Sequence, residues 1–261
     1  MLTAMAQPWM SVVVPAYNEE STILGTLTAL RERLDEDGRP YEILVVDNAS
    51  TDRTVAAVES LGAGPAVRVL RNDLNRGKGY SVRRGMVEAT GSLRLLCDAD
   101  CAPSLVSLPR MVEAIEHADI AIGSRLAPGA DVARAQPLRR RLVGWPYIAL
   151  TRLLLREPTR DVYCGFKLWR GVAAQAVFSR QGIDGWAFDA ESLAMARRLG
   201  YRLTEVGIVW VNREASKLSI FRTLVPAVRD LLHARRNVRS QARAHAALPA
   251  DTLADSSESS A

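Results

Sequence analysis

Short apolar runs alternate with helix-like segments along the first half of this 261-residue chain. The runs at 11–15, 42–47, 66–72, 93–97 and 119–123 are typical of buried strands. The segments between them, at 21–34, 52–61, 78–89 and 108–118, have the spacing of amphipathic helices. This alternation predicts an α/β fold, with a mostly parallel central sheet and helices on both faces. The length favours one domain of this kind over two small ones.

Polar residues follow four of the predicted strands, at the point where each strand ends. They are Asn18 and Glu19, then Asp47, then Asp98 and Asp100, then Ser124 and Arg125. Open parallel sheets bind ligands at the carboxyl ends of their strands, so these positions predict a site. Asp98 and Asp100 supply the oxygen ligands that a hard divalent cation needs. The alternative for this pair is a solvated turn, which aspartate also favours.

Three further motifs have both a functional and a structural interpretation. The turn Asn75-Arg-Gly-Lys-Gly79 could bring backbone and the Lys78 charge to a phosphate, or could be a flexible surface turn. Asp189 and Glu191 follow an aromatic stretch and could act in acid–base chemistry, or could be acids placed at a helix N-terminus. Asp47 could accept a hydrogen bond from a nucleotide base, while its neighbours cap a helix.

Charge and cysteine content narrow the class of protein. The net charge of +5 and the pI of about 9.4 fit nucleic acid, an anionic membrane or a phosphorylated substrate. The arginines cluster with leucines rather than with interleaved aromatics, which speaks against nucleic acid. Three cysteines without a CxxC pair predict neither a disulfide framework nor a zinc site, so a reduced, cytoplasmic chain is expected. No run of about 18 apolar residues predicts a membrane span, and no signal peptide is expected.

The second half contains two basic amphipathic stretches, at 134–157 and 221–236. Both could lie at a membrane interface, or could pack on the sheet as ordinary helices. The expected organisation is an N-terminal segment 1–9, a catalytic domain 10–225 with candidate membrane-interface helices at 134–157, a basic amphipathic helix 226–247, and a disordered tail 248–261.

Taken in order, these motifs resemble the family 2 glycosyltransferases with a GT-A, Rossmann-like fold. The resemblance rests on Val14-Pro-Ala-Tyr-Asn-Glu-Glu20, Val46-Asp-Asn-Ala-Ser-Thr-Asp52, Asn75-Arg-Gly-Lys-Gly79, Asp98-Ala-Asp100 and Gly123-Ser-Arg125, and covers roughly residues 8–225. Three later strings look like the dolichyl-phosphate β-glucosyltransferase subgroup. They are Arg160-Asp-Val-Tyr-Cys-Gly-Phe-Lys167, Gly185-Trp-Ala-Phe-Asp-Ala-Glu191 and Val211-Asn-Arg-Glu-Ala-Ser-Lys-Leu218.

The resemblance implies an inverting enzyme that moves glucose from UDP-glucose to a polyprenyl or dolichyl phosphate with Mg²⁺ or Mn²⁺. It implies a nucleotide-sugar site of Pro15, Tyr17, Glu19, Asp47, Lys78, Asp98, Ala99 and Asp100, with the metal on Asp98 and Asp100. It places Asp189, Glu191 and Arg125 at the reacting centre. Acceptor or donor phosphates would meet Arg125, Arg139, Lys167, Arg213, Ser216 and Lys217. The implied location is the cytoplasmic face of a membrane, with the chain attached peripherally.

Several alternatives stay open at this stage. The acceptor could be a soluble phosphorylated metabolite, the donor could be GDP-mannose, or the chain could bind sugar nucleotides without catalysis. Two departures from the family pattern bear on these alternatives: Asn48 stands where a second acid is usual, and the N-terminal membrane anchor of eukaryotic members is not seen here. A homo-oligomer is compatible with the sequence, and nucleic acid is not expected as a partner.

Overall fold

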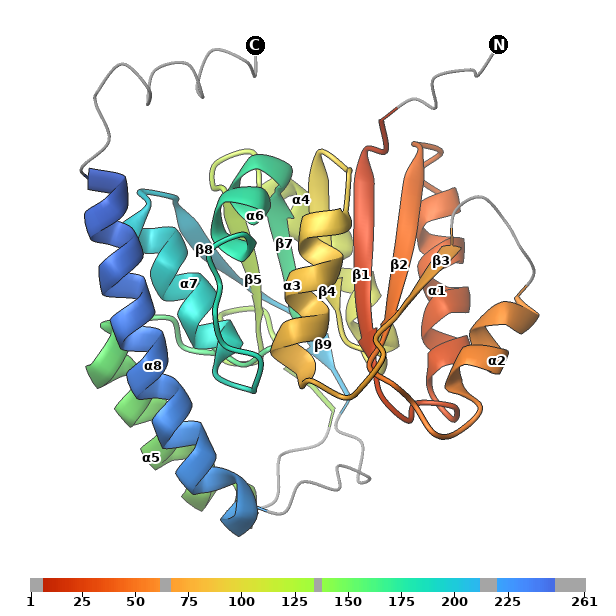
Figure 1. Ribbon diagram of the computed structural model, residues 1–261. Helices are drawn as coiled ribbons and strands as arrows, with labels where there is room; N and C mark the ends of the chain where they lie inside the picture. Colours follow the sequence, from red (N-terminus) through yellow and green to blue (C-terminus); the bar gives the residue numbers. More distant parts are fainter. Residues whose placement is uncertain (1–6, 62–66, 134–137, 212–219, 247–261) are drawn as a thin grey trace.

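A seven-stranded sheet forms the centre of the protein (Figure 1), seen here in a computed structural model that describes residues 7–61, 67–133, 138–211 and 220–246. The strand order is β3-β2-β1-β4-β7-β5-β8. The strands are β1 (Met10–Ala16), β2 (Tyr41–Asp47), β3 (Val67–Arg71), β4 (Leu93–Cys97), β5 (Ile120–Ser124), β7 (Phe166–Arg170) and β8 (Leu203–Gly207). Two short strands, β6 (Asp131–Val132) and β9 (Val209–Trp210), pair separately and in parallel.

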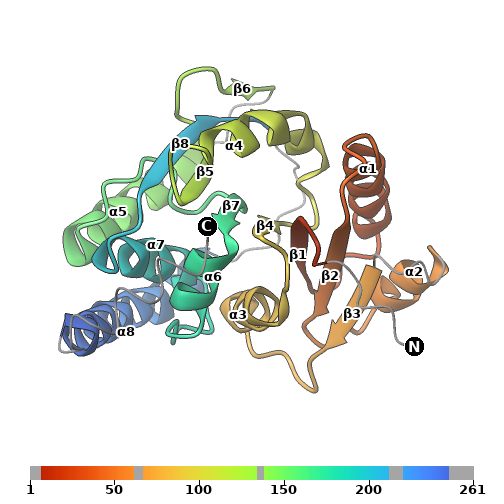
Figure 2. The ribbon, with the colours of Figure 1, turned by 90° about the horizontal axis from the view of Figure 1, so that it is seen from above.

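Helices cover both faces of the sheet (Figure 2). One face carries α1 (Ile23–Asp35), α2 (Thr54–Ser60), the 3₁₀ helix η1 (Ala102–Ser107) and α4 (Leu108–Ala114). The other carries α3 (Lys78–Glu88), α5 (Leu138–Leu155), α6 (Gly171–Phe178), α7 (Phe188–Arg198) and α8 (Ile220–Ala246). Along β1, Val12 and Val14 pack on the first face and Val13 on the second, as the two-residue period of a strand requires. The α/β fold expected from the sequence is confirmed.

One strand departs from the parallel pattern and matters for the site. β7 runs antiparallel to both β4 and β5, with Cys97 opposite Phe166 and Leu96 opposite Lys167. The residues at the start of β7 therefore lie at the same edge of the sheet as the carboxyl ends of β1, β2 and β4. The sequence did not predict β7, α6 or α7 as separate elements.

The other boundaries differ from expectation at a few places. The helix expected at 108–118 ends at Ala114 and is preceded by η1. The basic helix expected at 226–247 is part of α8, a 27-residue helix that also covers the expected domain limit at 225. No described helix has the length and apolar character needed to span a membrane. The tail expected at 248–261 lies outside the described residues.

Candidate active site

Four charged side chains from four elements meet at the carboxyl edge of the sheet. Asp98 directly follows β4, Lys78 is the first residue of α3, Lys167 lies in β7, and Asp189 is in the first turn of α7. Lys78 pairs with Asp98, and Lys167 pairs with Asp189. Lys78 and Asp98, both expected at the nucleotide-sugar site, are therefore in direct contact.

The Lys78–Asp98 pair is largely shielded from solvent. The Lys78 Nζ lies 2.6 Å from the Asp98 Oδ2, and the two side chains are 18% and 22% exposed. Burial opposes the charge on Lys78, but the carboxylates of Asp98 and Asp189 outweigh it and hold the pKa of Lys78 above its ordinary value. Within the described part of the chain, the other Asp98 oxygen, Oδ1, is buried and has no hydrogen-bond partner.

The glycines around Lys78 are required for close packing. Gly77 has a φ of +102°, and a Cβ there would lie 2.4 Å from the Asp184 carbonyl oxygen. A Cβ on Gly79 would lie 2.3 Å from the Ile183 carbonyl oxygen. The start of α3 is thus held against the loop before α7, and this contact brings Lys78 toward Asp189.

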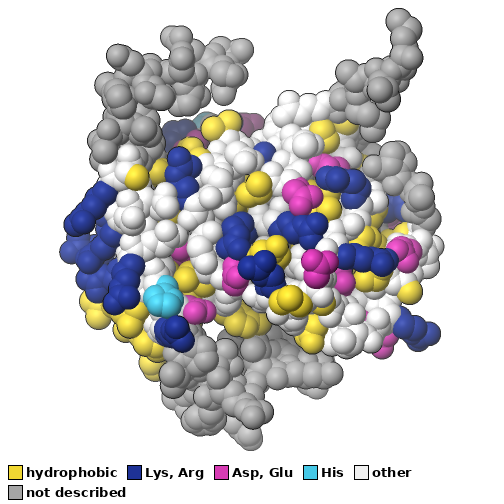
Figure 3. Space-filling view, viewed as in Figure 1, with side chains coloured by type: hydrophobic (Ala, Val, Ile, Leu, Met, Phe, Trp, Pro, Cys, Tyr) yellow, Lys and Arg dark blue, Asp and Glu magenta, His cyan; other side chains and the backbone are white. Residues whose placement is uncertain are grey.

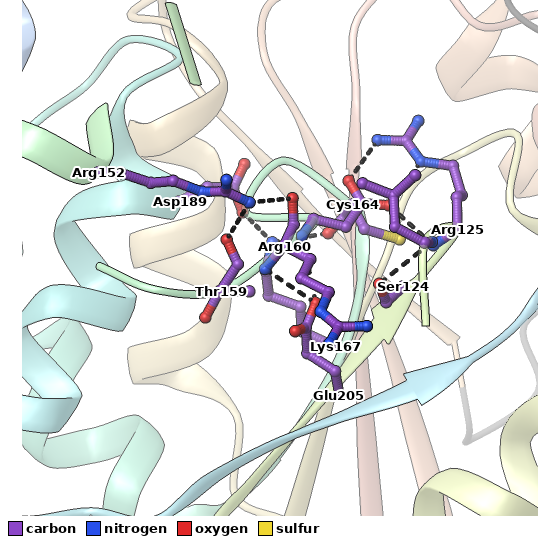
Figure 4. Close-up of polar contacts among 11 residues, drawn as sticks. Ser124, Arg125, Arg152, Thr159, Arg160, Cys164, Lys167, Asp189 and Glu205 are labelled. Atoms are coloured by element: carbon purple, nitrogen blue, oxygen red, sulfur yellow. Dashed lines mark hydrogen bonds and ion pairs between the residues drawn. The ribbon is translucent and has the colours of Figure 1, made fainter. Parts of the chain in front are cut away.

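The Lys167–Asp189 pair is the most buried charged contact of the site. Both side chains are nearly inaccessible, at 0% and 4% exposure, and the Lys167 Nζ also donates a 2.6 Å hydrogen bond to the Cys164 carbonyl oxygen. Burial raises the pKa of Asp189, and the ammonium groups of Lys167 and Lys78 offset part of that rise. Figure 4 shows Lys167, Asp189 and Cys164 around the loop that precedes β7.

Glu19, in the loop after β1, adds a further acidic side chain near this edge. Burial, together with the charges of Asp100, Asp98 and Asp52, raises the pKa of Glu19 despite a hydrogen bond from Thr22. The segment after Glu19 contacts the Asp98-Ala-Asp100 turn, because the Thr26 hydroxyl donates a 2.6 Å hydrogen bond to the Ala99 carbonyl oxygen. Among the residues that the structure describes, no group of three or more His, Cys, Asp or Glu side chains could by itself hold a metal.

The end of β2 carries Asp47, which was expected to meet a nucleotide base, and Asn48 follows it. Asp47 is buried, and its Oδ1 accepts a 3.2 Å hydrogen bond from the Ser50 backbone N–H, as a capping residue would. Asn48 binds the following loop through Asn75, Asn72 and the Arg76 N–H. The amide at position 48 both donates and accepts in these contacts, which an ionised acid could not do.

Arg125 is held by a carboxylate that the sequence analysis did not single out. Its Nε and Nη2 donate to the two Asp161 oxygens at 2.7 and 2.6 Å, and its backbone N–H donates to Asp161 Oδ2 at 2.9 Å. Burial opposes the charge on Arg125, but Asp161 outweighs it and raises the pKa of the guanidinium. The guanidinium carbon also lies 5.2 Å from the centre of the Trp210 ring. A phosphate at Arg125 would have to share it with Asp161.

Glu191, two residues after Asp189, is fully buried, and its oxygens bind neighbouring protein groups. Oε2 accepts the Gly182 and Ile183 N–H groups at 3.1 and 2.9 Å, and Oε1 accepts the Asn237 amide at 2.7 Å. These bonds tie the loop before α7 to α8. The structure therefore brings together Lys78, Asp98, Lys167 and Asp189, whereas Glu191 binds the loop before α7 and α8 instead.

The remaining expected site residues are distributed as follows. Pro15 and Ala99 are buried beside the edge, and Tyr17 is 45% exposed there. Arg139 lies in α5 with its side chain outside the described part, and Arg213, Ser216 and Lys217 lie outside the described residues.

Two residues of the site, Asp161 and Gly165, were given no role from the sequence, although both belong to strings that carried the family resemblance. Asp161 binds Arg125, and Gly165 admits Asp98, because a Cβ on Gly165 would lie 1.9 Å from Asp98 Oδ2.

The sequence profile of Glycosyl transferase family 2 matches residues 11–184, about two thirds of the chain. This chain is a family 2 glycosyltransferase. The matched segment begins in β1 and ends in the loop before α7, so it contains Lys78, Asp98 and Lys167 of the charged cluster.

Curated relatives and solved structures agree with this assignment. The chain is 34% identical over 237 residues to a dolichyl-phosphate beta-glucosyltransferase of Drosophila melanogaster, covering 85% of this chain and 73% of that protein. It is 31% identical to the protein of that name from Dictyostelium discoideum, over 87% of this chain and 74% of the other. The glucosyl-3-phosphoglycerate synthase of Mycobacterium tuberculosis, solved with Mn²⁺, UDP-glucose and phosphoglyceric acid, shares the fold, with a TM-score of 0.65 at 19% identity over 87% of this chain and 80% of that one.

Proposed function

We propose that this glycosyltransferase moves glucose from UDP-glucose to a polyprenyl phosphate, with inversion at the anomeric carbon. The observation that carries the chemistry is the chain of alternating charges Asp98, Lys78, Asp189 and Lys167 at the carboxyl edge of the sheet. The names of the relatives that align over most of this chain support the acceptor class.

The reaction forms a bond from an acceptor phosphate oxygen to the sugar's anomeric carbon and breaks the bond from that carbon to the diphosphate oxygen. UDP leaves with the electron pair, and one displacement converts an α-linked donor into a β-linked product. A phosphate monoester has a second pKa of about 6, so the attacking oxygen is already anionic near neutral pH. The step needs little help from a general base.

The main difficulty is the approach of an anionic acceptor to an anionic donor. Lys78 places a persistent positive charge at the edge, because Asp98 and Asp189 hold its pKa high. Asp189 is already bound to Lys167, so we assign it the role of organising the cluster rather than removing a proton. Arg125 contributes a further positive charge, on the side of the loop before β7 that lies away from Asp189 (Figure 4), and Asp161 orients its guanidinium.

A divalent cation fits the donor set at Asp98. The buried Oδ1 of Asp98 lacks a protein partner among the described residues, and Mg²⁺ commonly takes one or two carboxylates together with substrate phosphates. Asp98 and Asp100 would hold it, and it would neutralise charge on the leaving diphosphate. Asp47 and Tyr17 would contact the nucleoside from the ends of β2 and β1. The action of the protein at the cytoplasmic face of a membrane belongs to the same proposal.

An acceptor and donor panel tests this function. Purified protein is incubated with UDP-glucose or GDP-mannose, and with a short polyprenyl phosphate, the matching dephosphorylated polyprenol, or 3-phosphoglycerate, each with Mn²⁺ or chelator. We expect transfer only from UDP-glucose to the polyprenyl phosphate, and loss of transfer with chelator. Turnover with 3-phosphoglycerate alone would refute the lipid acceptor, and turnover with GDP-mannose alone would refute the donor.

A matched pair of variants connects that activity to the site. Asp98→Asn should abolish transfer, whereas Asp37→Asn, in the turn between α1 and β2, should leave it unchanged. Asp37 pairs with Arg39 at the opposite end of the sheet from the charged edge. Equal activity of the two variants would refute the assignment of Asp98.

A further inference from the structure

Four arginines converge on a shallow cleft on the outer surface, away from the charged edge. The cleft lies between the end of α5, the end of α7 and the middle of α8. Its lining is Arg156, Arg198, Arg235 and Arg239, with Leu154, Leu155 and Val238. Figure 3 shows Lys and Arg side chains gathered along the edge of the molecule that α8 occupies in Figure 1.

The positive charge of this cleft is not balanced within the described part of the chain. Among the described residues, no acidic side chain lines the cleft, and the four cleft arginines form no ion pair with any of them. The nearest acid in the sequence, Glu157, is buried and bound to Arg197 and Thr159.

The unbalanced positive charge affects two of these arginines, Arg235 and Arg239. The Arg235 Nε is buried and has no hydrogen-bond partner among the described residues, which is unfavourable for a charged donor. The positive charge of Arg235, with smaller effects from burial and from Arg198 and Arg156, lowers the pKa of Arg239.

The helix dipole explains the positions of only two of the four cleft arginines. Arg156 and Arg198 lie at the C-termini of α5 and α7, where the helix dipole favours a cation. Arg235 and Arg239 lie one turn apart in the interior of α8, where no such effect operates. Their convergence on the cleft therefore calls for an anion that the described residues do not supply.

We infer that the cleft binds a phosphate group, either in the headgroup of an anionic phospholipid or as a soluble phosphate. Guanidinium groups match phosphate oxygens with paired, directed hydrogen bonds, and a phosphate would supply the acceptor that Arg235 lacks. The exposed side chains of Leu153 and Leu232, on α5 and α8, are suited to contact with acyl chains beside a headgroup.

This site is separate from the catalytic edge. Asp189 and Arg198 lie nine residues apart at opposite ends of α7, a separation of about 14 Å along the helix. Binding at the cleft can therefore be measured without donor or acceptor. Failure of the transfer assay and failure of this inference are distinguishable.

The test compares two double variants of α8 with the same change in charge. Arg235→Gln with Arg239→Gln removes the cleft arginines, and Arg229→Gln with Arg236→Gln removes two exposed arginines that do not line it. One arm measures sedimentation with phosphatidylcholine vesicles with and without 20% phosphatidylglycerol, and the other measures equilibrium dialysis against radiolabelled inorganic phosphate. Thermal unfolding checks that each variant folds. If the Arg235→Gln, Arg239→Gln double variant does not fold, the Arg239→Gln single variant replaces it, because Arg239 is exposed.

We expect the cleft variant to lose affinity by about 30-fold, from roughly 1 kcal/mol for each arginine near an anionic surface, while the control changes by less than about fivefold. Loss confined to the vesicle arm identifies a lipid headgroup, and loss in the dialysis arm identifies a soluble phosphate. Equal losses in the two double variants would show diffuse attraction and overturn the site. Unchanged binding of the cleft variant in both arms would also overturn it.

Discussion

Replacing Lys167 with methionine tests whether the buried pair holds the site together. The change leaves the Asp189 carboxylate, which is 4% exposed, without its direct partner, and Lys78 as the remaining nearby cation. Breaking a buried pair by removing one partner costs about 3–5 kcal/mol of unfolding free energy. For a chain of this length, that corresponds to a fall in Tm of roughly 6–20 °C. Urea unfolding followed by tryptophan fluorescence measures the loss.

The double variant Lys167→Met with Asp189→Leu completes the cycle. Replacing both partners by apolar groups of similar volume is often neutral, so the double variant should be more stable than Lys167→Met by at least about 2 kcal/mol. The exposed pair of Arg33 and Glu36 is the control, because removing it should cost less than about 1 kcal/mol. A cost below about 1 kcal/mol for Lys167→Met, or strict additivity in the cycle, would contradict the reasoning.

The same variant predicts a change in the pH dependence of stability. The pKa of Asp189 is raised by folding, so its contribution to stability is fully present below the unfolded carboxyl pKa and is lost as pH rises through the folded value. Without the Lys167 ammonium the folded pKa of Asp189 rises further. From pH 5 to 8 the stability of Lys167→Met should therefore fall more steeply than that of the parent, by at most about 1.4 kcal/mol per pH unit. Parallel profiles would refute this assignment.

Two further substitutions follow from close contacts. Gly165→Ala places a Cβ 1.9 Å from Asp98 Oδ2 and should lower kcat/KM about 100-fold, because a shift of about 1 Å in a catalytic group has that effect. The control is Gly25→Ala, whose added Cβ would have no atom within 4 Å. In the same rate assay it should keep full activity, and its free energy of unfolding should rise by roughly 0.5–1 kcal/mol because alanine favours helix α1. Glu191→Gln should lower the free energy of unfolding in urea by about 1–3 kcal/mol, because at least one of the three N–H donors that Glu191 accepts would face an NH₂ group instead of an oxygen. An unchanged unfolding midpoint would show that these bonds do not hold the loop.

The sequence alone determined the parallel half of the fold and the acids at its edge. Buried strands such as β1, β2 and β4 are continuous apolar runs, and the residue after each run must lie at the carboxyl edge of a parallel sheet. Asp47 and Asp98 could therefore be placed from local pattern, and Lys78 from the glycine-bracketed turn before a helix, because each position depends on neighbours a few residues away.

Only the tertiary structure decided how the remaining charges are paired. The antiparallel direction of β7 places Lys167 beside the end of β4, and α7 then brings Asp189 to it across 22 residues of sequence. Arg125 and Asp161 meet across 36 residues. Hydrophobic periodicity reports which face of an element is buried, but not which distant element covers it, so these ion pairs had no local signature. The sequence pattern could not predict the arginine cleft for the same reason, because its residues lie at the ends of α5 and α7 and in α8, which are separate in the sequence.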